Sequence, residues 1–160
     1  MNLSVAVSQN WGIGYKNDLL FRISEDLKRF RKLTTGKTII MGHNTFKSLP
    51  GGKPLPNRTN IVLSRDTTLK IPDVIVCNSV EELQKHLHND VFIIGGEQVY
   101  RLLLDYCKTA YVTQVQATPP ADAFMPNLNE LPNWKLIEEE SPKTDGRLVY
   151  KYSTYVNQKN

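Results

Sequence analysis

The sequence predicts an α/β domain with a central, mostly parallel sheet, flanking helices and an antiparallel C-terminal edge. Short apolar runs typical of buried strands alternate with segments whose apolar residues recur at helical spacing, a pattern typical of parallel sheets. The last two extended segments are joined by Asp145-Gly146, a turn that favours an antiparallel hairpin. We expect all 160 residues to form one domain, because this length suffices to bury a core.

The N-terminal part is predicted to contain a strand, a glycine-bearing loop and a helix. Residues 4–8 form the strand and residues 9–22 the loop. The helix is expected from Ser24 to about Leu33, with Ser24 as its N-cap. Its apolar stripe consists of Ile23, Leu27, Phe30 and Leu33.

Strands and helices continue to alternate along the rest of the chain. Asn44 or Thr45 is expected to cap a short helix that ends near Leu49, and Ser79 with Glu82 forms a capping box before a helix that ends near Leu87. A further helix runs from about Glu97 to Asp105. The predicted strands are residues 37–41, 60–64, 74–77, 91–94, 109–116, 135–140 and 148–156. Residues 91–94 are the most apolar, which predicts a central strand.

Composition argues against several classes of protein. No apolar run approaches the ~20 residues of a membrane span, and the N-terminus lacks the pattern of a secretory signal, which favours a cytoplasmic protein. Cys77 and Cys107 lie far apart, so we expect reduced structural cysteines and no metal site. The net charge of +4 is spread along the chain without the aromatic and basic cluster of a nucleic-acid platform. An anionic small molecule is the better interpretation.

The first predicted helix carries an acid on its apolar side. Asp26 lies three residues after Ile23 and four before Phe30, so its carboxylate shares their face. A carboxylate against an apolar wall has a raised pKa, which suits proton transfer. The alternative is an acid that complements the helix dipole, although Glu25 already fits that role and can point outward. From the helix alone, both interpretations stay open.

Several predicted strand ends carry residues that suit an anion. In parallel sheets, ligands bind beyond the carboxyl ends of the strands. Gly42 and Gly95-Gly96 each separate a strand from a helix N-terminus, where free N–H groups favour a pyrophosphate. Ser64 and Arg65 end the third strand and are suited to hold an additional phosphate, with help from His43. This feature points to NADP rather than NAD.

Each of these signals also has an ordinary explanation. A glycine after a strand is commonly turn punctuation, and Gly12-Ile13-Gly14 lacks the third glycine of a dinucleotide fingerprint. His43 alone suits a surface or capping role, and Arg65 alone suits a solvated strand end. Taken together with the unusual acid, the pattern predicts an oxidoreductase or another nucleotide-binding enzyme.

The order and spacing of these residues resemble the bacterial dihydrofolate reductase family over nearly the whole chain. The segment I-G-G-x-x-V-Y from Ile94 to Tyr100 is specific, whereas M-G-x-x-T from Met41 is specific only in combination. The other matching segments are Gly12-Ile13-Gly14 with Asn17, Asp26-Leu27 with Phe30, Pro54-Leu55-Pro56 with Arg58 and Asn60, Leu63-Ser64-Arg65, and Tyr111 to Thr113.

The resemblance implies an NADPH-dependent reduction of 7,8-dihydrofolate to 5,6,7,8-tetrahydrofolate, in support of one-carbon metabolism. Hydride passes to pterin C6 and N5 takes a proton. Asp26 would be the catalytic residue and the only acid in the pterin pocket, held by Thr113, and Arg58 would pair with the substrate's glutamate α-carboxylate. The implied substrate-binding residues are Ser4, Val5, Asp26, Leu27, Phe30, Arg31, Leu49, Leu55, Arg58, Ile94 and Thr113.

The resemblance also implies an NADPH site and no metal. Residues 9–22 would form a mobile flap over the nicotinamide, and the Gly95–Gly96 bond would be cis. The partners implied are dihydrofolate and antifolate inhibitors, with no nucleic acid or membrane, and we expect a monomer. The implied cofactor residues are Ala6, Gly12, Ile13, Gly14, Tyr15, Lys16, Asn17, Asp18, Leu19, Gly42, His43, Asn44, Thr45, Leu63, Ser64, Arg65, Ile94, Gly95, Gly96, Glu97, Gln98, Val99 and Tyr100.

The chain departs from the family at a few positions. Leu20-Phe21 replaces the usual Pro-Trp, and Ser24 replaces a second proline. The resemblance implies a water near Asp26, and the lost indole N–H leaves open how that water is anchored. His43 stands where many bacterial members have arginine, which shifts the expected binding of the 2′-phosphate towards Arg65, and Gln98 also replaces a frequent arginine. Two alternatives stay open: a same-fold reductase of the pteridine or riboflavin pathway, and a non-catalytic nucleotide-binding module. The second would not need Asp26.

Overall fold

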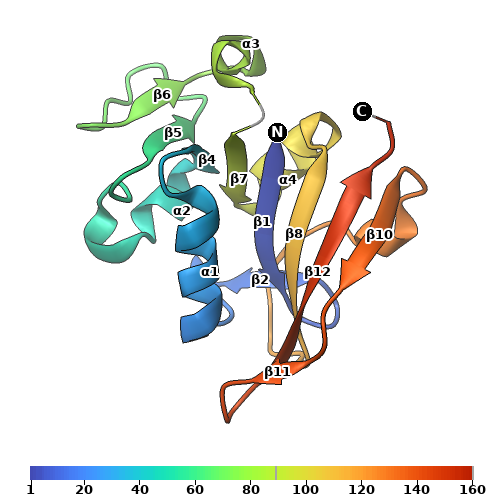
Figure 1. Cartoon of the computed structure of the whole chain (residues 1–160). Coiled ribbons are helices and arrows are strands. Elements are labelled where there is room, and N and C mark those ends of the chain that lie inside the picture. Colours follow the sequence, from blue (N-terminus) through green and yellow to red (C-terminus); the bar gives the residue numbers. More distant parts are fainter. Residues whose placement is uncertain (89, 160) are drawn as a thin grey trace.

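The computed structural model describes residues 1–88 and 90–159, and its centre is one large sheet (Figure 1). Along this sheet the strands follow the order β10-β12-β8-β1-β7-β4-β5-β6, with β11 beside β12. Their bounds are β1 (Asn2–Val7), β4 (Thr38–Gly42), β5 (Thr59–Leu63), β6 (Ile75–Cys77), β7 (Val91–Gly95), β8 (Thr109–Val115), β10 (Trp134–Glu139), β11 (Lys143–Thr144) and β12 (Val149–Asn157).

The predicted mixture of parallel and antiparallel pairing is confirmed. β1 pairs in parallel with β7 and β8, β4 does so with β7 and β5, and β5 does so with β6. The hairpin of β10, β11 and β12 adds an antiparallel edge, joined to the rest where β12 pairs with β8. β7 lies between β1 and β4, as its apolar sequence predicted.

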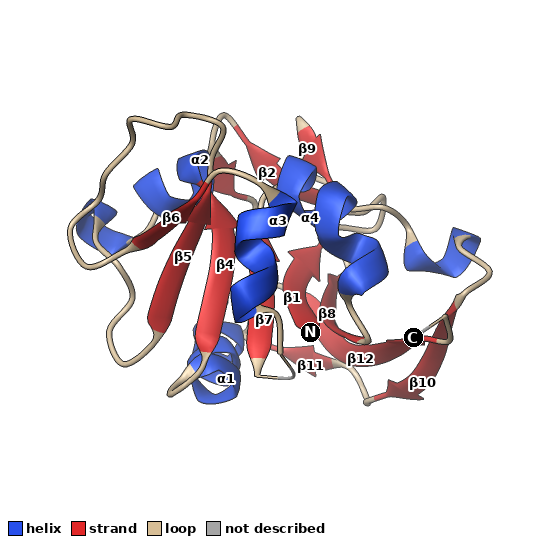
Figure 2. Ribbon diagram, turned by 90° about the horizontal axis from the view of Figure 1, so that it is seen from above, coloured by secondary structure: helices blue, strands red, loops and turns tan. Residues whose placement is uncertain are grey.

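Short helices cover both faces of this sheet. α1 (Ser24–Thr34) lies on one side, and α3 (Val80–Leu83) and α4 (Glu97–Leu103) lie on the other (Figure 2). Strand β7 shows why both faces need cover: Val91 and Ile93 belong to one apolar cluster and Phe92 to another. The remaining helix is α2 (His43–Lys47), and single 3₁₀ turns occupy Pro50–Gly52, Gln84–His86, Leu104–Tyr106 and Leu128–Glu130.

A second, three-stranded sheet occupies the segment expected to be a plain loop. It consists of β2 (Gly12–Tyr15), β3 (Asp18–Leu19) and β9 (Ala123–Phe124), in the order β3-β2-β9. The prediction of an irregular segment at residues 9–22 was therefore wrong in part. β2 gains its partner β9 from a distant part of the chain, and no local alternation of apolar residues signals that pairing.

The predicted helix caps were wrong at two of three helices. Ile23 is the N-cap of α1 and Gly42 that of α2, and neither cap makes a side-chain hydrogen bond. At α3 the Ser79 side chain accepts from the Glu82 N–H, as predicted. The Glu82 carboxylate, however, accepts from the N–H of Asn78 rather than from that of Ser79.

Within the described residues, no helix is long and apolar enough to cross a membrane. The same residues contain no group of three or more histidine, cysteine or carboxylate side chains placed to hold a metal ion. Cys77 is a free, buried thiol, and the buried Cys107 thiol donates to the Leu103 carbonyl at 3.5 Å.

Candidate active site

Asp26 lies in the first turn of α1 and reaches the sheet. The Thr113 hydroxyl on β8 donates a hydrogen bond of 2.6 Å to Asp26 Oδ1, and Thr113 is only 3% exposed. Burial raises the pKa of the Asp26 carboxyl, while the Thr113 bond and the nearby Arg29 charge lower it. The structure thus brings together the acid and the hydroxyl that the sequence placed 87 residues apart.

The apolar residues expected to surround a substrate differ in their exposure. Leu49, Leu55 and Ile94 are partly buried and pack on the cluster that contains Phe46 and Phe92. Leu27, expected in the buried stripe of α1, is 46% exposed instead. Ile23 and Leu33 of the same predicted stripe do meet the apolar clusters, so the stripe is confirmed at those two positions.

Arg58 is held in place by neutral acceptors. Its Nε donates to the Pro56 carbonyl at 2.9 Å and its Nη1 to the Thr34 hydroxyl at 3.2 Å. The Thr34 hydroxyl in turn donates to the Phe30 carbonyl. Burial and the charge of Arg31 both lower the pKa of Arg58, so two guanidinium groups share this end of α1. Such a pair attracts a carboxylate.

The glycine junctions after β4 and β7 lie next to each other, because these strands pair directly. The Gly95–Gly96 bond is cis, as the resemblance implied. A Cβ added at Gly95 or Gly96 would lie 3.3 Å from Thr45 Oγ1, and one at Gly42 would lie 3.3 Å from a Val99 methyl group. A side chain at any of these positions would crowd Thr45 or Val99, which glycine avoids.

The Tyr100 side chain ties α4 to the sheet beneath the glycine junction. Its hydroxyl donates to the Ser4 carbonyl on β1 at 2.7 Å, and the ring is 3% exposed. Burial raises the pKa of Tyr100 far above its ordinary value, so the phenol stays neutral. The Ser4 carbonyl thus anchors α4 to β1, and the role of Ser4 towards a substrate stays a prediction.

Ser64 and His43 are brought together by strand register. Gly42 pairs with Leu63 across β4 and β5, so the residues that follow each strand begin side by side. Ser64 is half-buried and Arg65 is exposed. The His43 charge helps to lower the pKa of Asp66, behind the larger contribution of hydrogen bonds from Thr68, which places His43 close to this turn.

The flap, defined as residues 9–22, is fastened at several points. The Ser8 hydroxyl accepts from the Gly12 N–H at 2.8 Å. Asp122 accepts from the Lys16 N–H at 3.0 Å, and its own N–H donates to the Gly14 carbonyl at 2.9 Å. Glu97 accepts from the Phe124 N–H at 2.6 Å. The flap is thereby linked through β9 to the first residue of α4.

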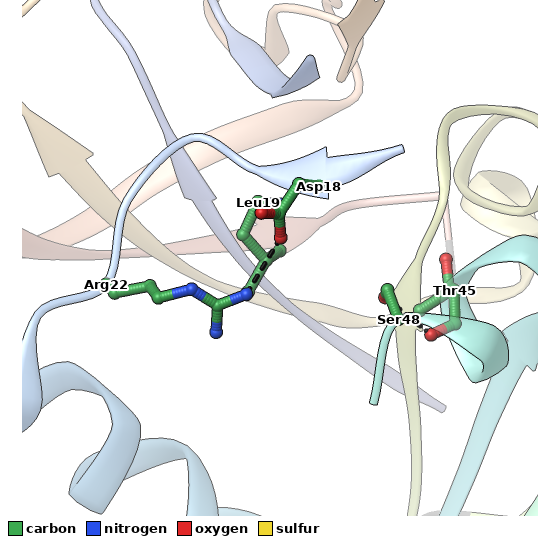
Figure 3. A network of polar contacts seen from close by, with 5 residues as sticks. All are labelled: Asp18, Leu19, Arg22, Thr45 and Ser48. Atoms are coloured by element: carbon green, nitrogen blue, oxygen red, sulfur yellow. Dashed lines mark hydrogen bonds and ion pairs between the residues drawn. The ribbon is translucent and has the colours of Figure 1, made fainter. Parts of the chain in front are cut away.

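Figure 3 shows the tip of the flap and α2 in one close view. The Asp18 carboxylate pairs with Arg22 at 2.8 Å, and Leu19 beside it is 52% exposed. On α2 the Ser48 hydroxyl donates to the Thr45 carbonyl at 2.7 Å (Figure 3). Two residues of interest were missed from the sequence. Asp122 lies in a proline-rich loop without a motif, whereas the i, i+3 spacing of Arg29 from Asp26 could have identified Arg29.

A mostly parallel sheet with adjacent glycine junctions, a tethered flap and a half-buried acid is typical of an α/β enzyme that binds a nucleotide. The dihydrofolate reductase family matches residues 1–159. The chain belongs to the dihydrofolate reductase family. Its membership does not favour a riboflavin-pathway reductase or a non-catalytic module.

Individual relatives agree with this membership. A dihydrofolate reductase of Staphylococcus aureus is 35% identical over 147 residues, which cover 91% of this chain and 90% of that protein. One of Buchnera aphidicola subsp. Baizongia pistaciae is 37% identical over 161 residues, with 94% and 96% covered. A solved dihydrofolate reductase of Enterococcus faecalis, complexed with NADP(H) and RAB-propyl, superposes with a TM-score of 0.86 at 29% identity, over 98% of this chain and 95% of that one.

Proposed function

We propose that this enzyme reduces 7,8-dihydrofolate to 5,6,7,8-tetrahydrofolate with NADPH, and that Asp26 supports protonation of pterin N5. The observation that carries the role of Asp26 is its position: a half-buried carboxylate, bonded to Thr113, whose pKa burial raises. A carboxyl whose pKa lies above its ordinary value is suited to proton exchange. The family supplies the reaction, and the position of Asp26 supplies a group suited to its protonation step.

The residues at the strand ends fit an extended dinucleotide. The adjacent glycine junctions at Gly42 and Gly95-Gly96 keep the backbone open, and side chains added there would meet Thr45 or Val99. Ser64, Arg65 and His43 would hold the 2′-phosphate, and the flap would cover the nicotinamide. When bound, NADPH supplies the hydride.

The substrate would lie between α1 and the loop that holds Arg58. Asp26 would bind the pterin 2-amino group and N3, and the low local dielectric would strengthen its effect on positive charge that develops there. Leu27, Phe30, Leu49 and Leu55 would contact the rings, with Ser4, Val5 and Ile94 beside the pterin. Arg58, assisted by Arg31, would bind the glutamate α-carboxylate bidentately.

We further propose that the enzyme acts as a monomer in the cytoplasm and that antifolates compete at the pterin site. The cytoplasmic proposal is supported by Cys77, which is a free buried thiol in the fold. No nucleic acid or membrane partner is proposed.

The first experiment measures the loss of NADPH absorbance with dihydrofolate for the parent and for Asp26→Asn. The variant keeps the shape of Asp26 and a hydrogen-bond acceptor for Thr113, so it should fold and bind NADPH. Its single-turnover hydride transfer at neutral pH should fall by roughly a hundredfold or more, and should recover partly at low pH as solvent supplies the proton. Superimposable pH profiles for the two proteins would remove Asp26 from the reaction.

A further inference from the structure

A cation near Asp26, Arg29, lies against the rings of Tyr152 and Tyr111, which are called its aromatic seat below. Arg29 follows Asp26 by three residues in α1, so the two side chains share one helix face. The guanidinium carbon of Arg29 lies 4.0 Å from the ring centroid of Tyr152 and 5.9 Å from that of Tyr111. Both distances are within the range of a cation–π contact.

Strand pairing places this seat directly beside the partner of Asp26. Thr113, which donates to Asp26, pairs with Tyr152 across β8 and β12. Tyr111 lies two residues before Thr113 on β8 and so points to the same face of the sheet. Tyr150 packs edge-on against Tyr152 with centroids 5.7 Å apart, which supports that ring. Arg29 is therefore held one strand away from the Asp26–Thr113 bond.

The other charged groups near this end of α1 have partners of their own. Glu25 pairs with Lys28 at 3.2 Å, and Arg22 pairs with Asp18 at 2.8 Å. Lys143 of β11 lies 6.0 Å from the Tyr152 ring. On β12, burial and then the Asp26 charge raise the pKa of Tyr152 to about 12, so this phenol is neutral. The Arg29 charge lowers the pKa of Asp26, a smaller effect than that of burial or of the Thr113 bond.

We propose that Arg29, seated on Tyr152 and Tyr111, is a positioning residue that stabilises the ionised form of Asp26 and thereby sets the pH range of hydride transfer. This inference rests on the proposed role of Asp26 in the reduction. Burial favours the neutral carboxyl, and the Thr113 hydrogen bond and then the Arg29 charge oppose that effect. The aromatic seat keeps the cation within range, where a free arginine side chain would move through solvent.

The test compares single-turnover hydride transfer against pH at low salt for four proteins. They are the parent, Arg29→Met, Arg29→Lys and the control Lys28→Met, which removes a charge from an exposed position of the same helix. Without the Arg29 charge, Asp26 holds its proton to higher pH, so the alkaline limb of the profile should move upwards in pH. The rate on that limb should rise roughly two- to fivefold, as expected of a partly exposed charge pair. Arg29→Lys and Lys28→Met should stay close to the parent.

Salt provides a second readout that a purely structural role would not change. Raising ionic strength screens a half-exposed cation, so the parent profile should move towards that of Arg29→Met, whose own profile should respond less. Equal salt responses of the two proteins would overturn the proposal.

Repeating Arg29→Met in the Asp26→Asn background separates this inference from the proposed function. If Arg29 acts through Asp26, its substitution should leave the pH profile of Asp26→Asn unchanged. Two outcomes would overturn the role of Arg29 and leave that of Asp26 intact. One is an equal shift of the pH profile in both backgrounds. The other is no shift in either background although Asp26→Asn itself differs from the parent. A profile of Asp26→Asn identical to that of the parent would instead overturn the role of Asp26.

Discussion

Arg58 shows how a single side chain is prepared for a ligand by groups that do not neutralise it. The Pro56 carbonyl and the Thr34 hydroxyl orient its guanidinium, and neither acceptor carries a charge. Among the described residues it forms no ion pair, and the Arg31 charge near it makes an added anion favourable. The positive charge is therefore available to a carboxylate from outside the chain.

Replacing Arg58 by leucine should raise the KM for dihydrofolate and leave NADPH affinity nearly unchanged. The loss of a bidentate, charge-assisted contact should reduce substrate binding by about 2–4 kcal/mol. Steady-state kinetics with titrated dihydrofolate measures this, together with NADPH binding by fluorescence. Arg147→Leu, in the distant β11–β12 turn, is the matched control. An unchanged KM in Arg58→Leu would place Arg58 outside the substrate site.

At the scale of elements, the flap is held by contacts that are distant in sequence. Asp122 and β9 come from the loop after β8, and they pair with β2 near the N-terminus. Glu97 then joins this loop to α4 and to the Gly95-Gly96 junction. A change in the β8–β9 loop can thus reach two of the proposed cofactor-binding segments without touching the cofactor.

Asp122→Ala should loosen the flap while the main sheet stays intact. The Lys16 N–H loses its acceptor, so the hydrogen-exchange protection of Lys16 and Gly14 should fall, and NADPH affinity should fall roughly two- to tenfold. Asp145→Ala is the control, because Asp145 makes the same kind of backbone contacts in the remote β11–β12 turn. If exchange at Lys16 is the same in parent and Asp122→Ala, the bond does not restrain the flap.

Elements that are determined by local sequence could be predicted, whereas elements that depend on distant residues could not. The strands of the main sheet were predictable because local apolar runs such as residues 91–94 need only a buried environment. β2 and β9 were not, because Gly12–Tyr15 has no such run and depends on a partner more than 100 residues away. Ser24 is not the N-cap of α1 because it is already the first helical residue, and the extended residue before the helix is Ile23. Leu27 was expected in the buried stripe of α1 but is exposed.

The candidate site divides in the same way. Asp26 could be identified in the sequence because it is an acid at a position on the apolar face of the helix. Its hydrogen bond to Thr113 on β8 agrees with that placement. The seat of Arg29 needed the pairing of β8 with β12, which only the tertiary structure shows. The roles of the substrate and cofactor residues stay predictions, to be tested residue by residue.

At the scale of the whole molecule, Asp26 should make the fold less stable near neutral pH. Its pKa is raised above the ordinary 3.8 in the folded chain. Below that value both folded and unfolded chains hold the proton. As pH rises, the unfolded chain releases the proton first, so folding stability falls until pH passes the folded-state pKa.

Asp26→Asn should therefore have a higher Tm than the parent at pH 7, and the difference should shrink towards pH 3. Each kcal/mol recovered corresponds to about 2–4 °C for a chain of this size. Thermal unfolding followed by circular dichroism at several pH values measures the difference. Asp105→Asn, at an exposed site on the opposite part of the molecule, should show no comparable gain. A variant less stable than the parent at pH 7 would mean that the Thr113 bond outweighs desolvation.

The exposed leucines beside Asp26 and on the flap connect ligand binding to the lifetime of the protein in a cell. Leu27 and Leu19 present 46% and 52% of their surface to solvent, and both are proposed to be covered by bound molecules. Any molecule that covers them binds the folded chain but not the unfolded one, and so lowers the unfolded population by mass action. Proteases act on that population, so a bound antifolate would slow the turnover of its own target. The amount of folded enzyme in the cell would then rise while the ligand is present.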